Sequence, residues 1–219
     1  MITLYHCAGA RSFRPLWALE ELGLAYEMRM LPFPPRFLQP DYLNINPLGT
    51  IPLFLDDGVR MTESVAILQY LAGKHGPTSM AVEAGEPGFA DYLNFLHFGE
   101  ATLTFPQTIY FRYALLETAE KRQPIVADNY ARWFKKRMIG IEEQLLHHDW
   151  IAADRFTFAD ISVGFALQFA QILKLDDEFT PKVQAYAARL RARPAFKLAR
   201  AAEKQGSIEA PGATRTLSS

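Results

Sequence analysis

The sequence predicts a small α/β domain followed by an all-α domain, and three observations lead to this prediction. Over residues 2–75 short β-rich runs alternate with helical stretches. Residues 76–88 are rich in glycine, proline and small polar types, as expected of an exposed linker. Beyond residue 89 only helical periodicity appears. We therefore expect an α/β domain at 1–76, a linker at 77–88, a helical domain at 89–206 and a disordered tail at 207–219.

Each element of the first domain has a local cause. Residues 14–22 carry apolar side chains at helical spacing and stop at Gly23, which suits a helix C-cap. The proline-rich segment 32–40 cannot continue a strand, because proline has no amide hydrogen to donate. Asp56-Asp57-Gly58 indicates a hairpin turn. The expected elements are strands at 2–6, 25–31, 53–55 and 59–61 and helices at 14–22 and 63–74.

The second domain is expected to contain helices only. Thr157 and Asp160 have the spacing of a capping box at a helix start, with Asp160 in place of the more usual glutamate, and Phe156 can pack onto Ile161. We interpret this motif as structural. The helices are expected at 89–119, 124–147, 158–174, 180–192 and 195–204.

Composition and charge exclude several classes of function. The 219 residues are 49% apolar and 21% charged, which is typical of a globular protein. The net charge of −1 offers no basic surface for nucleic acid or an anionic membrane. No apolar run approaches the ~20 residues of a membrane span, and no signal peptide is evident, so we expect a cytoplasmic protein. Cys7 is the only cysteine and the histidines lack metal-ligand spacing, so we expect neither a disulfide nor a metal site.

The strongest chemical signal lies in residues 46–52 and the pair Glu63-Ser64. Pro52 biases Ile51 towards an extended conformation and is a natural site for a cis bond that turns the Ile51 backbone outward. An exposed backbone could pair with an extended peptide as an added strand does. Glu63 and Ser64 would stand at the start of the next helix, where free amides attract a carboxylate, and Glu63 could hold an ammonium group. These features predict a pocket for a small zwitterionic peptide; the alternative is that Pro52 only ends a loop while Glu63 and Ser64 only cap a helix.

These segments resemble the cytosolic glutathione transferases of bacterial type over most of residues 1–200. The resemblance implies a thioredoxin-like N-terminal domain that binds glutathione as co-substrate, an α-helical domain that shapes the second-substrate pocket, and a homodimer. The motifs that carry it are Ser12-Phe13-Arg14-Pro15-Leu16-Trp17-Ala18-Leu19-Glu20-Glu21-Leu22-Gly23, Asn46-Pro47-Leu48-Gly49-Thr50-Ile51-Pro52, Thr62-Glu63-Ser64-Val65-Ala66-Ile67-Leu68-Gln69-Tyr70-Leu71 and Phe158-Ala159-Asp160-Ile161.

Position by position, the resemblance implies how glutathione is bound. The Ile51 backbone would pair with the cysteinyl part beside a cis-Pro52, and Glu63 and Ser64 would hold the γ-glutamyl end. Thr50 stands where many relatives carry lysine, so Gln39 or Arg36 could instead supply the contact to the glycyl carboxylate. The implied glutathione-binding residues are Gln39, Thr50, Ile51, Pro52, Glu63 and Ser64.

The group that activates the glutathione thiol is less clearly indicated. Ser12, just before the first helix, is the preferred thiolate donor; its alternative role is a plain N-cap. Many bacterial relatives carry a further serine where this chain has Ala10, and the turn around Ser12 is similar to that of β-etherases in the same superfamily. Arg11 could favour the thiolate through its charge. Tyr5, at the strand end, and Cys7, as a cysteine nucleophile, are the less favoured candidates, and a buried, inert Cys7 is the favoured interpretation.

The second substrate is indicated only weakly. Phe105-Pro106 interrupts the helical pattern, and by resemblance the residues beyond it line the second-substrate pocket, so Phe105, Tyr110 and Tyr113 are candidates, with core packing as the alternative. Aromatic walls favour a hydrophobic electrophile. The expected function is a glutathione transferase that joins the thiolate to an apolar electrophile and has a role in detoxification. The alternatives are disulfide reduction or β-aryl ether cleavage at the same site, or a non-catalytic glutathione-binding or regulatory protein.

Overall fold

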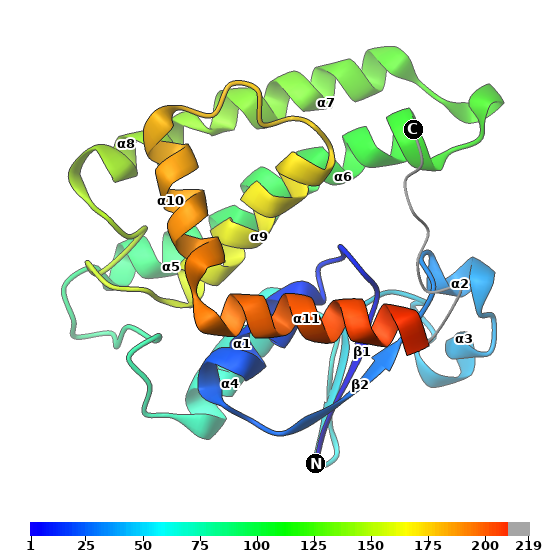
Figure 1. The fold of residues 1–219 in the computed structure, drawn as a ribbon, viewed down its shortest axis with the longest axis horizontal. Helices are drawn as coiled ribbons and strands as arrows, with labels where there is room; N and C mark the ends of the chain where they lie inside the picture. The colour runs from blue at the N-terminus through cyan, green and yellow to red at the C-terminus, as the bar shows by residue number, and fades with distance from the viewer. Residues whose placement is uncertain (210–219) are drawn as a thin grey trace. The chain divides into compact units, whose positions relative to one another are not determined.

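The computed structural model describes residues 1–209 and is shown in Figure 1. The described residues form two compact units, one made of Met1–Gly76 together with 192–209, the other made of Pro77–Arg191. Within the described residues no helix is long and apolar enough to cross a membrane.

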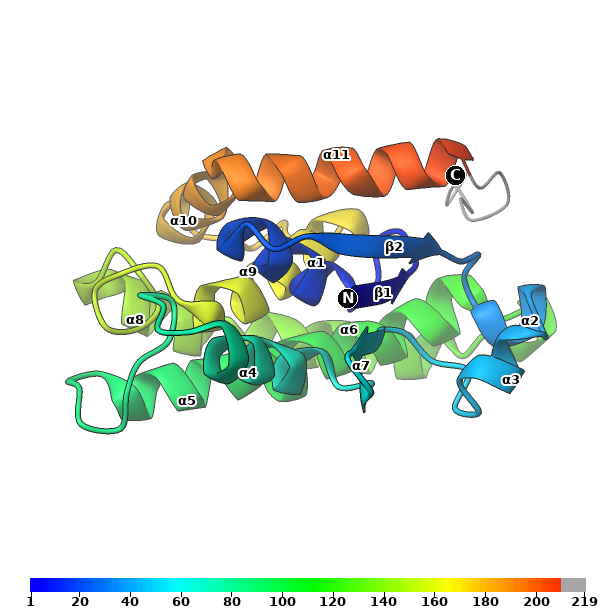
Figure 2. The ribbon, with the colours of Figure 1, turned by 90° about the horizontal axis from the view of Figure 1, so that it is seen from below.

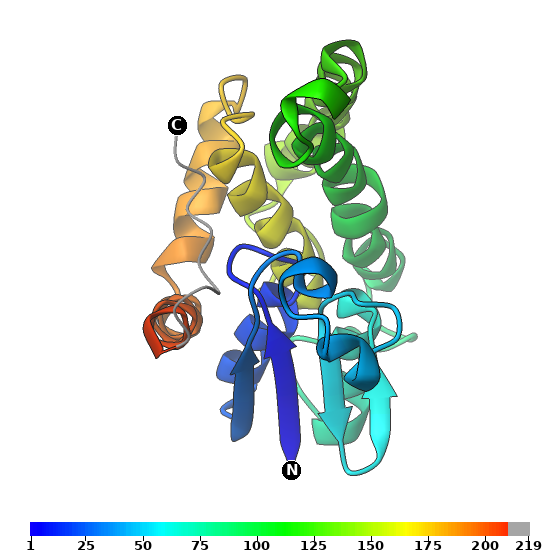
Figure 3. The same ribbon diagram turned by 90° about the vertical axis from the view of Figure 1, so that its right-hand side faces the viewer.

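A four-stranded mixed sheet forms the centre of the first unit. Its elements are β1 (Ile2–His6), α1 (Phe13–Leu22), β2 (Tyr26–Met30), α2 (Pro35–Leu38), α3 (Tyr42–Ile45), β3 (Leu53–Asp56), β4 (Val59–Met61), α4 (Ser64–His75) and α11 (Pro194–Glu209). The strand order is β2-β1-β3-β4, with β1 parallel to β2 and antiparallel to β3, and β3 antiparallel to β4 (Figure 3). A βαβ unit followed by a hairpin and a helix is the thioredoxin-like arrangement that the sequence predicted.

Helix α11 packs on this sheet unit, along β2 and α1 (Figure 2). The ring of Phe196 meets Trp17 edge to face, with centroids 4.9 Å apart. Arg193 forms two ion-pair contacts with Glu21 of α1, at 2.6 and 2.8 Å. A Cβ at Gly206 would lie 2.6 Å from a side-chain atom of Met30, so glycine allows the close approach to β2. The last helix therefore belongs to the first unit, whereas the sequence-based division grouped residues 195–204 with the helical domain.

The second unit is helical throughout its described elements. These are α5 (Phe89–Phe98), the π-helix η1 (Gly99–Thr104), α6 (Phe105–Phe111), the π-helix η2 (Arg112–Leu116), the 3₁₀-helix η3 (Ala119–Lys121), α7 (Pro124–Arg137), α8 (Ile139–His147), α9 (Phe158–Ile172) and α10 (Pro181–Ala192). The stretch expected as one helix at 89–119 thus changes geometry several times. Pro106 explains the first change: it donates no hydrogen bond and its ring crowds the carbonyl four residues earlier, and the wider π-helical turns precede it.

Two local features position α9. A Cβ at Gly99 would lie 2.5 Å from the backbone of Ser162, so η1 and α9 cross with almost no space between them. The capping box of Thr157 and Asp160 is confirmed: the Thr157 amide donates to Asp160 Oδ2 at 2.7 Å. Asp160 also accepts from the Tyr186 hydroxyl at 2.7 Å and from the Ile151 amide at 3.1 Å. The motif therefore ties three segments of the unit together.

Some elements differ from the sequence prediction. The segment expected as a loop at 32–40 contains the short helix α2, and α3 follows it. The helix expected at 124–147 is broken at Met138 into α7 and α8. Helix α11 continues to Glu209, because Ser207 donates to the Glu203 carbonyl at 2.8 Å and is buried. Residues 207–209 are therefore helical, and the rest of the expected tail, 210–219, lies outside the described residues.

Candidate functional site

The segment 46–52 is built so that the Thr50 carbonyl is fixed and a cis-proline bond follows the next residue. The side-chain amide of Asn46, which is buried, donates to the Thr50 carbonyl at 2.8 Å, and the Tyr42 hydroxyl donates to the same oxygen at 2.8 Å. The Ile51–Pro52 peptide bond is cis, as the sequence analysis expected. Gly49 has φ +60°, and a Cβ there would lie 2.7 Å from the Arg36 side chain, so this turn requires glycine.

Ile51 offers an unpaired backbone. Within residues 1–209 neither its amide nor its carbonyl has a hydrogen-bond partner, although the residue as a whole is only 9% exposed. Its side chain belongs to a cluster with Cys7 and Tyr42, against which Ala10 packs. The cluster brings the turn at residues 7–12 beside Ile51. A free amide donor and a free carbonyl acceptor on one residue are what an added peptide strand needs for pairing.

Helix α4 begins beside a buried arginine. Glu63 precedes the helix in an extended conformation, is exposed, and its side chain makes no hydrogen bond within the described residues. Ser64 is 4% exposed, and its Oγ accepts a hydrogen bond from Arg14 Nη1 at 3.1 Å. Arg14 comes from α1 and is fully buried. The positive charge, the first amides of α4 and the Ser64 hydroxyl together favour a carboxylate at this end.

Arg14 is the residue of this site that the sequence analysis missed. Its position within the first turn of a helix gives no sign that it is buried, since arginine is usually exposed. Only the packing of α1 against α4 brings it to Ser64. Its positive charge lies in a low-dielectric interior next to the start of α4, where it would attract a carboxylate more strongly than it would in water.

Ser12 is fully buried and its hydroxyl already has two partners. Oγ lies 2.7 Å from His6 Nδ1 and accepts from the Cys7 amide at 3.3 Å. His6 Nε2 in turn lies 3.1 Å from Glu203 Oε1. Ser12 precedes α1 without a side-chain cap hydrogen bond, so the plain N-cap role is not observed. As a thiolate donor Ser12 remains a prediction, and it would require the hydroxyl to turn away from His6.

The other two activation candidates lie in or near the core. Cys7 is fully buried, as the favoured interpretation expected, and burial raises the pKa of its thiol. A neutral thiol is a poor nucleophile, so the interior position disfavours mixed-disulfide chemistry at Cys7. Tyr5 is partly buried and its ring lies 5.6 Å from that of Tyr42. It packs against the same cluster as Ala10.

The remaining predicted residues of the first unit are accessible. Arg11 is partly buried on the turn before α1. Thr50 and Gln39 are exposed, and Gln39 ends the short helix α2. Arg36 is also exposed, with its guanidinium 4.6 Å from the centre of the Phe37 ring. All the predicted glutathione-binding residues thus belong to the same unit.

The predicted second-substrate residues lie in the other unit. Phe105 is 44% exposed and its ring lies 6.1 Å from that of Tyr130 of α7. Tyr110, on α6, and Tyr113, on η2, are partly buried, and the Arg112 guanidinium lies 5.3 Å from the Tyr113 ring. They stay candidates for an apolar wall.

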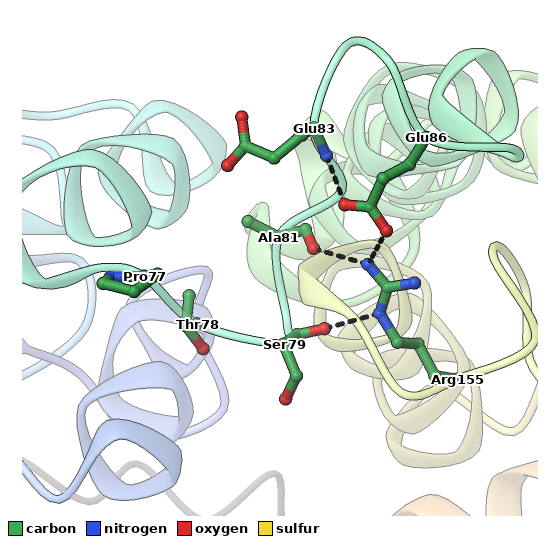
Figure 4. A pocket seen from close by; sticks show the side chains of 7 residues that line it. All are labelled: Pro77, Thr78, Ser79, Ala81, Glu83, Glu86 and Arg155. Atoms are coloured by element: carbon green, nitrogen blue, oxygen red, sulfur yellow. Dashed lines mark hydrogen bonds and ion pairs between the residues drawn. The ribbon is translucent and has the colours of Figure 1, made fainter.

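A surface pocket in the second unit is separate from all predicted site residues. Arg155 holds the segment beside it: Nε donates to the Ser79 carbonyl at 2.8 Å and Nη2 to the Ala81 carbonyl at 2.9 Å and to Glu86 at 2.8 Å (Figure 4). Met80 in this segment is buried. The expected linker is therefore fixed within the second unit. The pocket is lined by Pro77, Thr78, Ser79, Ala81, Glu83, Glu86 and Arg155.

Within the described residues no group of three or more histidine, cysteine, aspartate or glutamate side chains could hold a metal ion. What the first unit presents is a residue with an unpaired backbone amide and carbonyl, a helix start beside a buried arginine, and a turn before α1. This set of groups can bind a short peptide and hold one of its side chains against the turn.

Comparison with known proteins identifies the same two-part organisation. Residues 1–73 match the family model for the glutathione S-transferase N-terminal domain, and residues 107–194 match the model for the glutathione S-transferase C-terminal domain. Glutathione S-transferase 3 of Schizosaccharomyces pombe is 29% identical over 212 residues, which cover 91% of this chain and 86% of that protein. Glutathione S-transferase 2 of Saccharomyces cerevisiae is 30% identical over 166 residues, covering 73% and 70%.

Solved structures agree with the sequence comparisons. A glutathione transferase of Methylococcus capsulatus superimposes with a TM-score of 0.79 at 27% identity, covering 94% of this chain and 100% of that one. The similarity thus extends over both units.

Proposed function

The chain belongs to the glutathione S-transferase family, and we propose that it conjugates the thiolate of glutathione to an apolar electrophile. Glutathione is the co-substrate, as in the family. The observation that carries the proposal is the unpaired backbone of Ile51, beside a cis-proline and within the same unit as the carboxylate-binding start of α4.

Glutathione is proposed to lie extended across this surface. Its cysteinyl residue pairs with the amide and carbonyl of Ile51. Its γ-glutamyl carboxylate accepts from the Ser64 hydroxyl and the first amides of α4, and Glu63 faces its ammonium group. Thr50 and Gln39, both exposed, are the proposed neighbours of the glycyl end. The buried charge of Arg14 supports the carboxylate through Ser64.

The thiol must be ionised before it can attack. A thiol with a pKa near ~8.5 is only a few per cent ionised at neutral pH, and lowering that pKa by two units requires ~2.7 kcal/mol of preferential interaction with the thiolate. We assign this first to the charge of Arg11 and to the positive end of the α1 dipole. Ser12 contributes by direct donation only if its hydroxyl leaves His6.

The proposed reaction is nucleophilic substitution or addition. With an aryl halide the sulfur forms a bond to the ring carbon, the halide leaves with the electron pair of the broken bond, and the thiol proton goes to solvent. Phe105, Tyr110 and Tyr113 are the proposed apolar contacts of the electrophile. We further propose a cytoplasmic homodimer with a role in detoxification.

The test is an ultraviolet difference titration of the protein with glutathione across pH. We expect a thiolate band with an apparent pKa clearly below that of free glutathione. Arg11→Ala is expected to raise that pKa by about one unit, equivalent to ~1.4 kcal/mol, whereas the control Arg29→Ala, an exposed arginine paired with Glu27, leaves it unchanged. Glutathione binding without a thiolate band would refute conjugation and favour a binding protein. Failure to bind glutathione would refute the assigned pocket.

A further inference from the structure

A buried chain of hydrogen bonds joins α11 to the turn before α1. Glu203 Oε1 lies 3.1 Å from His6 Nε2, and the same oxygen accepts from the Gly9 amide at 2.8 Å. Glu203 Oε2 pairs with Arg200. On the other side of the imidazole, His6 Nδ1 lies 2.7 Å from Ser12 Oγ. His6 and Ser12 are fully buried and Glu203 is 4% exposed, so the chain is closed to solvent.

The proton positions in this chain follow from the state of Glu203. Burial raises the pKa of Glu203, but the hydrogen bond from His6, the positive charge of Arg200 and the Gly9 amide outweigh burial and hold the pKa below its usual value. An ionised carboxylate only accepts, so His6 Nε2 carries a proton and donates to it. With one proton on the ring, Nδ1 accepts from the Ser12 hydroxyl, whose oxygen accepts from the Cys7 amide.

The order serine, histidine, glutamate resembles the arrangement of a hydrolase, but the burial excludes that use. A nucleophilic serine must reach its substrate, and here neither Ser12 nor His6 has any exposed surface. The chain instead fixes three points of the same turn: the amides of Cys7 and Gly9 and the side chain of Ser12. Gly9 has φ +69°, a conformation that L side chains rarely adopt.

The turn held in this way faces the residue that is proposed to pair with glutathione. Ala10, which follows Gly9, packs against the cluster that contains Ile51. A cysteinyl side chain from a peptide paired with Ile51 therefore meets residues of this turn. The orientation of Arg11 depends on the anchors on either side of it, Gly9 and Ser12.

We propose that Glu203, on the C-terminal helix, is a positioning residue for the glutathione thiolate: by holding the Gly9 amide and His6 it fixes the turn at residues 7–12 that faces the sulfur. The inference rests on the proposed function. It extends the site to α11, far along the chain from every residue assigned from the sequence.

Two variants of Glu203 separate its role as a hydrogen-bond acceptor from the effect of its negative charge. Glu203→Ala removes the acceptor and releases Gly9 and His6. Glu203→Gln keeps an oxygen that can accept from both, while its amide faces the half-exposed Arg200, which can move away. Loss of a negative charge alone would lower the pKa of a nearby thiol, whereas loss of the anchor raises it because the stabilising groups are no longer aligned. The sign of the shift therefore distinguishes the two causes.

Arg193→Ala is the matched control. It removes the ion pair between Arg193, the residue just before α11, and Glu21 of α1, and so loosens the start of the same helix without touching the turn. We expect Glu203→Ala to raise the apparent pKa of bound glutathione by about one unit and to reduce kcat at pH 6.5 about fivefold, with KM for the electrophile unchanged. Glu203→Gln should restore most of both, and Arg193→Ala should leave the pKa as in the wild type.

The possible failures can be told apart. If the wild type lowers the thiol pKa but Glu203→Ala leaves it unchanged or lowers it further, the positioning role is overturned and the proposed function stands. An equal rise in Arg193→Ala assigns the effect to helix docking and also overturns it. If the wild type does not bind or ionise glutathione, the proposed function fails and the inference with it.

A spectroscopic measurement tests the chain even if Glu203→Ala does not fold. Long-range proton–nitrogen correlation spectra of the wild type, assigned against His6→Gln, should show His6 protonated on Nε2, with Nδ1 bare and accepting a hydrogen bond. The opposite tautomer would mean that His6 donates to Ser12 and not to Glu203, and would overturn the inference.

Discussion

Replacing Ser64 by alanine tests the carboxylate-binding end of the site most directly. The Ser64 oxygen accepts from Arg14 Nη1 at 3.1 Å. Arg14 donates to one lone pair of Ser64 Oγ, so the Ser64 hydroxyl proton is free to be donated to another acceptor. The carboxylate of the proposed ligand is that acceptor. Ser64→Ala removes this donor and also leaves one proton of a buried guanidinium without its partner.

The expected loss can be worked from these contacts. A hydrogen bond to a charged group contributes about 1.5–3 kcal/mol. Loss of the bond from Ser64 to the carboxylate therefore predicts a dissociation constant about 10- to 150-fold higher, since each 1.4 kcal/mol is a factor of ten. The hydrogen bond from Arg14 is lost in the free and in the bound protein alike. Its loss therefore lowers the free energy of unfolding and leaves the dissociation constant unchanged.

Isothermal titration calorimetry with glutathione measures the affinity, and thermal denaturation checks that the variant is folded. Ser79→Ala is the matched control, because Ser79 is exposed, lies in the second unit and its side chain makes no hydrogen bond within the described residues. It should change the dissociation constant by less than about threefold. A folded Ser64→Ala protein with an affinity equal to that of the wild type would refute the placement of the γ-glutamyl carboxylate at α4.

Three further predictions concern reactivity and packing. Because burial raises the pKa of Cys7, a thiol reagent at pH 8 should not label the native protein but should label one thiol per chain in denaturant; fast native labelling would contradict its burial. Gly99→Ala should lower the free energy of unfolding by about 1–3 kcal/mol, because the added Cβ would lie 2.5 Å from the Ser162 backbone. The control Gly73→Ala on α4, where a Cβ meets no atom within 4 Å, should raise the free energy of unfolding by up to about 1 kcal/mol. Equal effects of the two variants in urea denaturation would disprove the close crossing of η1 and α9. Thr157→Ala should cost about 1–2 kcal/mol by the same assay through loss of the helix cap, and an unchanged midpoint would show that the capping box does not stabilise the unit.

The features that could be predicted from the sequence are those fixed by neighbouring residues. The strand at 2–6, the hairpin around Asp57-Gly58 and the capping box of Thr157 and Asp160 all appear in the structure where the patterns indicated. Each depends on contacts within a few residues of the chain, so local patterning is enough. The cis bond between Ile51 and Pro52 belongs to the same class.

The changes of helix geometry beyond Phe89 were not predictable in this way. Hydrophobic periodicity is the same for one long helix and for α-helices joined by π-helical turns, so it gave a single helix at 89–119. The close crossing at Gly99 shows how tightly the tertiary fold constrains this stretch.

The sequence by itself determined the family, the thioredoxin-like unit and the segment with the cis-proline, because these are carried by motifs of consecutive residues. Only the tertiary structure decided what surrounds them. Arg14 and Ser64 are separated by 50 positions, and His6 and Glu203 by 197. Burial of a cation beneath a helix start, and of a carboxylate against a histidine, depends on how α1, α4 and α11 pack, and side-chain types along the chain do not specify which distant groups will meet.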